Sequence, residues 1–166
     1  ELGNHSCFHP CRKDANKGWL EDGYDPKSYS SRRWCEEMRA ANFTLSLIDG
    51  LAPTQRSFGN TFNDTFIGPE DNSLSLEPVI DELFVAGRGG GEARSINVHE
   101  PVNMNNLGNR VFDLMPIDQC IAHLEQTLTN KHWQIVEIHG VGTGTHNLFV
   151  EEHDHYAICQ YLADHP

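Results

Sequence analysis

The sequence is poor in cationic residues and lacks any long apolar run. Its 166 residues include 12 Lys and Arg against 24 Asp and Glu, which gives a net charge of −12. Nucleic acids are bound through clustered cations that displace counterions from the phosphates, so this balance argues against a nucleic-acid partner. No stretch of about 18 apolar residues is present, and a membrane span is therefore not expected. The length suits one ordinary domain.

Cysteine, by contrast, is frequent. Five cysteines are more than a cytosolic domain of this length needs, and they favour an oxidising compartment. Cys7 and Cys11 lie in residues 1–24, which show little periodicity and are interpreted as an irregular leader. We expect disulfides that tie this leader down, for instance to Cys35. The odd count leaves one thiol unpaired, and Cys120, on the apolar side of its helix, is the candidate.

Two acceptor sites for N-glycans, at Asn42 and Asn63, are compatible with secretion. We therefore expect an extracellular or lumenal location. One hypothesis is therefore that the chain is a secreted structural or interaction glycoprotein, with its acidic segments on the solvated surface.

Three helices are predicted from apolar spacing. The first lies between Asp25-Pro26 and Gly50, with apolar residues in steps of four and three at Trp34, Met38, Ala41, Leu45 and Ile48. The other two span Leu76 to Ala86 and Pro116 to Leu128. Residues 51–75 are rich in Asn, Gly, Ser, Thr and Asp and are predicted to be a long ordered loop.

The last third is predicted to end in a hairpin of two strands between Gln134 and Ile158, joined by the glycine-containing loop 139–146. Side chains alternate along a strand, so Glu152, Asp154 and Tyr156 would share one face of the second strand. Buried ionisable groups are costly unless they are used or paired, which makes this strand a candidate site. The alternative is that both faces are wet at the end of a sheet.

The order of elements predicts an α+β fold. We expect a curved mixed or antiparallel sheet with helices packed on one side, formed by a single domain over residues 25–166.

Three short segments, 31–43, 102–104 and 150–154, resemble the nuclear transport factor two superfamily in its SnoaL-like and limonene epoxide hydrolase branch. The resemblance implies a cone-shaped barrel that binds an apolar small molecule without a redox cofactor, often as a homodimer. Carried over by position, Asp154 and Asn103 match the residues that position water in the epoxide hydrolases. Glu152 stands where that family has Arg, and Pro101 where it has Tyr.

A second resemblance is to the Smr-type nuclease domain. Ile138 to Gly144 is similar to its second motif, Tyr161 to Pro166 to its end, and Phe112-Asp113-Leu114 to its first motif, although Met115-Pro116 replaces the His-Gly expected there. The acidic charge argues against a nuclease surface.

These patterns favour a cofactor-independent hydrolase, isomerase or cyclase that acts on an apolar small molecule. Asp154 would be the general base, together with Glu152, and His153 or His155 would transfer protons near neutral pH. Asn103 would orient a water or a carbonyl. Such a chain is expected to form a homodimer or to bind a partner chain that completes its sheet.

Divalent metal binding is the main alternative. His139, His146, His153 and His155 lie in or beside the predicted hairpin, and imidazole with carboxylate suits zinc, iron or copper. A second possible set lies in the leader, where thiolate and imidazole could suit a tetrahedral zinc; it consists of His5, Cys7, His9 and Cys11.

Overall fold

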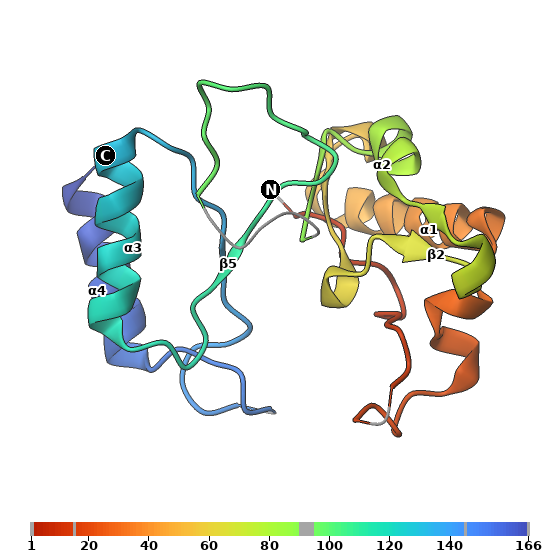
Figure 1. Ribbon diagram of the computed structural model, residues 1–166, viewed down its shortest axis with the longest axis horizontal. Helices are drawn as coiled ribbons and strands as arrows, with labels where there is room; N and C mark the ends of the chain where they lie inside the picture. Colours follow the sequence, from red (N-terminus) through yellow and green to blue (C-terminus); the bar gives the residue numbers. More distant parts are fainter. Residues whose placement is uncertain (1, 15, 90–94, 145, 166) are drawn as a thin grey trace. The chain divides into compact units, whose positions relative to one another are not determined.

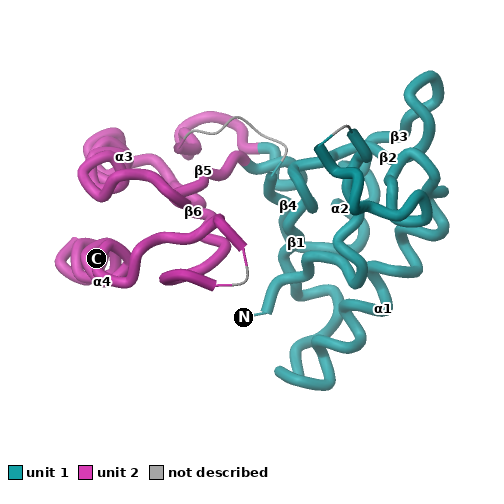
Figure 2. Tube along the Cα trace, turned by 90° about the horizontal axis from the view of Figure 1, so that it is seen from below, with its two compact units in different colours: residues 1–91, 103–107 teal, residues 92–102, 108–166 magenta. Residues whose placement is uncertain are grey.

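The computed structural model describes residues 2–14, 16–89, 95–144 and 146–165 (Figure 1). The chain divides into two compact units (Figure 2). Unit 1 consists of residues 1–91 and 103–107, and unit 2 of residues 92–102 and 108–166. Each unit has helices and short strands, so the predicted α+β class is confirmed.

The long helix of unit 1 is α1 (Ser31–Asp49). It begins after Ser30, whose hydroxyl accepts a hydrogen bond from the Arg33 amide, and it ends at Gly50, which has a φ of 71°. Of the predicted stripe, Trp34, Met38 and Ala41 are buried, whereas Ile48 is exposed. The predicted beginning at Asp25-Pro26 belongs instead to a separate short turn, η2 (Pro26–Ser28).

A row of parallel segments packs against this helix. The strand β1 (Ser57–Gly59) forms a parallel pair with β4 (Ala86–Arg88). Asn4 extends the row on the β1 side through a bridge to Phe58, and Leu107 extends it on the β4 side through a bridge to Arg88. The core of unit 1 lies here, with the ring of Phe58 contacting Trp34 and Phe84 at centroid distances of 5.2 and 4.9 Å.

The remaining elements of unit 1 are short. An antiparallel pair is formed by β2 (Phe66–Ile67) and β3 (Leu74–Ser75), and α2 (Glu77–Leu83) follows it. Four further 3-10 turns complete the described part of the unit: η1 (Asp22–Tyr24), η3 (Pro53–Gln55), η4 (Thr61–Asn63) and η5 (Glu70–Asn72). The segment 51–75, which the sequence predicts to be a long loop, contains several of these short elements.

Unit 2 is built on a strand-helix-strand arrangement. β5 (Arg110–Val111) runs parallel to β6 (Val136–Glu137), and α3 (Ile117–Asn130) connects them. The last helix, α4 (Glu152–Asp164), packs beside α3 (Figures 1 and 2). Their shared core contains Phe112, Leu124, Val150, Ile158 and the buried Cys120.

The predicted hairpin over residues 134–158 is wrong. β6 pairs with β5 instead, and residues 152–164 form α4. A period of two predicts a strand for the acidic run, but Ile158 and Tyr161, which follow it and reach the core, are three residues apart, as on one face of a helix. Glu152 and Asp154 fall in the first turn, where negative side chains stabilise a helix through its dipole.

The predicted cone is not observed. Within the described residues each named sheet has two strands, and none closes on itself. Two of these three pairs are parallel, which reflects the connections through helices rather than hairpins.

The five cysteines are all free thiols, so the predicted link from Cys7 or Cys11 to Cys35 is absent. Cys120 is buried, as expected of a small apolar side chain. Of the two glycan acceptors, Asn42 is only 2% exposed and its side chain is hydrogen-bonded to Asn4 and Pro53, which leaves no room for a glycan. Asn63 is exposed. No helix in the described part of the chain is long and apolar enough to cross a membrane.

Candidate functional sites

Asp113 and His139 form a close polar pair in unit 2. Asp113 follows β5 and His139 follows β6, and because these strands are parallel, the residues after them meet at the same edge of the pair. Asp113 Oδ1 accepts a hydrogen bond from the His139 backbone amide at 2.9 Å, and Oδ2 lies 2.5 Å from Nδ1 of the ring. The Asp113 side chain is 1% exposed, while that of His139 is 38% exposed. A buried carboxylate therefore orients an imidazole that solvent can reach.

Glu137 contacts the other nitrogen of the same ring. Its Oε1 lies 3.3 Å from His139 Nε2, and its Oε2 accepts a hydrogen bond from the Asn109 amide. An ionised carboxylate only accepts hydrogen bonds, so the contact with Asp113 requires a proton on Nδ1. Nε2 is then the atom that can give or take a proton, and Glu137 can accept a hydrogen bond from it only when Nε2 carries that proton.

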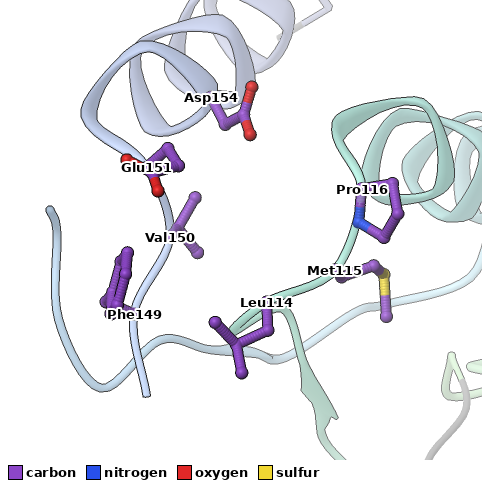
Figure 3. Close-up of a pocket in the computed structure, with 7 residues that line it drawn as sticks. All are labelled: Leu114, Met115, Pro116, Phe149, Val150, Glu151 and Asp154. Carbon is purple, nitrogen blue, oxygen red and sulfur yellow. The ribbon is translucent and has the colours of Figure 1, made fainter. Parts of the chain in front are cut away.

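A pocket of about 260 Å³ lies in the same unit (Figure 3). One wall comes from the segment between β5 and α3, and the other from the segment that enters α4; the lining residues are Leu114, Met115, Pro116, Phe149, Val150, Glu151 and Asp154. The backbone amide of Leu114 donates to the Phe149 carbonyl at 2.9 Å and joins the two walls. The lining is mostly apolar, and its ionisable groups are both carboxylates.

His5 and His9 form a close pair of imidazoles in unit 1. Their Nε2 atoms are 3.1 Å apart. His5 Nδ1 lies 2.8 Å from the Gly59 carbonyl, which only accepts, so His5 carries its proton on Nδ1 and presents a lone pair on Nε2. Two imidazoles on a tetrahedral zinc, each about 2.0–2.1 Å from the metal, have nitrogens about 3.3 Å apart. The observed separation is close to this value.

The backbone between these two histidines adopts an uncommon conformation. Ser6 and His9 have φ angles of 68° and 50°, in a region that residues other than glycine rarely occupy. The Ser6 amide donates to Asn4 Oδ1 at 2.7 Å, and the His9 amide donates to the Ser6 hydroxyl at 2.8 Å. Strained backbone that is held by several partners is typical of ligand-binding loops.

The larger metal sets expected from the sequence are not formed. No group of three or more His, Cys, Asp or Glu side chains is arranged to hold a metal ion anywhere in the described ranges. In the leader set, Cys7 Sγ lies 3.7 Å from the Glu37 carbonyl and Cys11 is buried, so only the two histidines converge. In the hairpin set, His139 and His146 are neighbours with ring centroids 6.2 Å apart, while His153 and His155 lie on α4.

The residues expected to be catalytic are dispersed. Asp154 lines the pocket, but from the first turn of α4 rather than from a strand, and it pairs with His153 at 3.1 Å. Glu152 is in the same turn, and His155 lies against Cys159 with Nε2 3.8 Å from Sγ. Asn103 belongs to unit 1, where its amide donates to Glu77.

Sequence reasoning did not assign a role to the pair of Asp113 and His139. Each residue is the second one after a short strand, and the two strands flank one helix, which indicates side chains at one edge of a parallel pair. The predicted hairpin after Gln134 places His139 in a connecting turn, so it gives no reason to expect His139 beside Asp113. The sequence does indicate His5 and His9, which are four residues apart, as possible zinc ligands.

The chain matches no protein-family model, no curated protein and no solved structure. The resemblances based on short motifs therefore stay expectations, and the function is argued from the sites themselves.

Proposed function

We propose that this protein is a hydrolase in which His139 is the general acid–base and Asp113 orients it. The observation that supports this proposal is the double contact of the Asp113 carboxylate, which holds both the ring and the backbone amide of His139. A histidine fixed in this way keeps one tautomer and one orientation, and positioned proton transfer typically contributes about 10²–10⁴-fold to a rate.

The charge of this part of the chain indicates the class of substrate. Residues 108–166 contain two Lys or Arg against eight Asp or Glu, and no Lys or Arg is among the described residues that line the pocket. A phosphate ester would be repelled, which argues against the nuclease expected from the Smr-type resemblance. The substrate we propose is a neutral or amine-bearing ester or amide with an apolar group that enters the pocket beside Asp154.

Activity on a panel of neutral and amine-bearing esters and amides tests this proposal. We expect His139→Ala to lower kcat by a factor of about 100 or more on any substrate that the wild-type protein hydrolyses. His165→Ala is the matched control, because His165 follows α4 and, among the described residues, its ring contacts Tyr161 through the backbone carbonyl and the stacked ring. Equal turnover by His139→Ala and wild type would remove His139 from the reaction.

A second function, divalent-metal binding by His5 and His9, is favoured by a separate observation. The two Nε2 atoms face each other at nearly the spacing of zinc ligands, and the Gly59 carbonyl fixes the tautomer of His5. Zinc is usually four-coordinate, so a pair of imidazoles would fill two positions and leave two for water or a substrate, one more than the three-ligand catalytic zinc sites leave.

Calorimetric titration with zinc tests the histidine pair. We expect His5→Ala and His9→Ala each to weaken binding at least tenfold, because each removes half of the protein ligands. Gly59→Ala should also weaken it, since a Cβ there would lie 3.0 Å from His5 Nδ1 and displace the ring. His165→Ala should bind zinc like the wild type, and wild-type affinity in His5→Ala would contradict the site.

A further inference from the structure

We propose that Glu37 is the positioning residue of the His5–His9 pair, an inference that rests on the proposed metal site. Glu37 lies on the buried face of α1 and is 7% exposed. Its Oε1 accepts hydrogen bonds from the backbone amides of Cys7 and Phe8, both at 3.1 Å. These two amides belong to the residues between the histidines, so one carboxylate oxygen holds the loop that carries both of them.

The loop needs such an acceptor because of its geometry. Backbone amides that leave regular secondary structure must find other partners, and here two consecutive amides point at the same oxygen. This arrangement is possible because the chain turns at Ser6 and at His9 with positive φ angles. The acceptor is supplied by a helix rather than by the loop itself, which fixes the position of the loop relative to α1.

The other oxygen of Glu37 is also fixed. Oε2 accepts a hydrogen bond from the Tyr29 hydroxyl at 3.1 Å, and Tyr29 is 4% exposed. Burial and the nearby charge of Glu37 raise the pKa of Tyr29 to about 12, so the hydroxyl keeps its proton and continues to donate at neutral pH. The Arg33 guanidinium lies over the Tyr29 ring, 3.9 Å from its centroid. Glu37 is therefore held at both oxygens and is not free to leave the loop.

Zinc titration of Glu37 variants tests the inference. Supporting hydrogen bonds around metal sites typically alter affinity by about 10–100-fold, and we expect a loss in this range for Glu37→Ala. Glu37→Gln retains an acceptor oxygen for the two amides and should keep most of the affinity. Glu37→Asp retains the charge but withdraws the oxygen by one methylene, so it should also lose zinc affinity. This variant replaces Glu37→Ala as the test if Glu37→Ala does not fold. Glu36→Ala is the control, because Glu36 is exposed and pairs with Arg32 at 2.7 Å.

A metal-free unfolding curve for each variant separates positioning from stability. A residue that is merely structural would lower the unfolding temperature while the folded molecules bound zinc normally. Wild-type zinc affinity in both Glu37→Ala and Glu37→Asp, with binding lost in His5→Ala, would overturn this inference alone. Absence of zinc binding by the wild-type protein would overturn the metal site and the inference with it.

Discussion

Replacement of Asp113 by Asn should lower kcat on a hydrolysed substrate by about 10³–10⁴-fold, the scale of loss seen when the orienting carboxylate of a catalytic histidine becomes an amide. The carbonyl oxygen of Asn can still accept from the His139 backbone amide, which the wild-type carboxylate does at 2.9 Å. The amide nitrogen then faces Nδ1 and donates to it. The ring is forced into the tautomer with its proton on Nε2, which cannot act as a base.

The measurement is kcat and KM for Asp113→Asn beside Asp118→Asn, whose carboxylate is in the exposed first turn of α3. The expected loss is in kcat, because the carboxylate acts on the histidine and not on the bound substrate. A loss confined to KM would assign Asp113 to substrate binding instead. Unchanged kinetics in Asp113→Asn would exclude the proposed role.

Replacement of Arg56 by Met should remove a large part of the stability of unit 1. Arg56 is fully buried, and its guanidinium donates to both oxygens of Asp49, at 2.8 and 2.5 Å, and to the Leu2 carbonyl at 2.7 Å. It thereby ties the end of α1 and the N-terminal segment to the residue before β1. Hydrogen bonds to charged groups contribute about 1.5–3 kcal/mol each, and the Asp49 carboxylate that is left behind is 18% exposed, so the expected loss is about this size. Domains are stable by only about 5–15 kcal/mol, so urea unfolding should show a clear shift of the midpoint.

Acid titration provides an independent check on Arg56. Hydrogen bonds from Arg56 are the main reason that the pKa of Asp49 lies well below its ordinary value of 3.8. A depressed pKa in the folded state adds stability above the ordinary pKa and loses it as the pH falls further. The stability of the wild type should therefore fall more steeply below about pH 4 than that of Arg56→Met. Arg39→Met, which removes an exposed ion pair with Glu82, should match the wild type in both measurements.

The parts of the fold that could be predicted are those with a long periodic signal. The first helix repeats its apolar spacing over several turns, and its buried residues Trp34 and Met38 and its end at Gly50 are as predicted. β5 and β6 are two residues long, which is too short for any period to show. Their parallel pairing follows from the helix α3 that connects them. The glycine-containing loop after His139 resembles a hairpin turn, and it therefore favours an antiparallel pairing that the structure does not have.

The candidate sites depend on contacts that no local pattern contains. The spacing of His5 and His9 is visible in the sequence, but the support from Glu37 comes from a helix that begins at Ser31. Asp113 meets His139 only because two strands pair in a particular register. Asp154 does line a pocket, although the reasoning that pointed to it assumed a strand.

The parallel row in unit 1 has a consequence for how this unit folds. Its bridges join residue 4 to residue 58, strand 57–59 to strand 86–88, and residue 88 to residue 107, so every partner is distant along the chain. Closing such long loops costs conformational entropy before the stabilising contacts form, so we expect unit 1 to fold slowly. Until Asn4 pairs, the backbone of β1 is an open edge on which a second unfolded chain can align. The segment that carries Asn4 covers this edge of β1 in the folded protein, and we expect a protein shortened by residues 2–9 to aggregate more readily than the full chain.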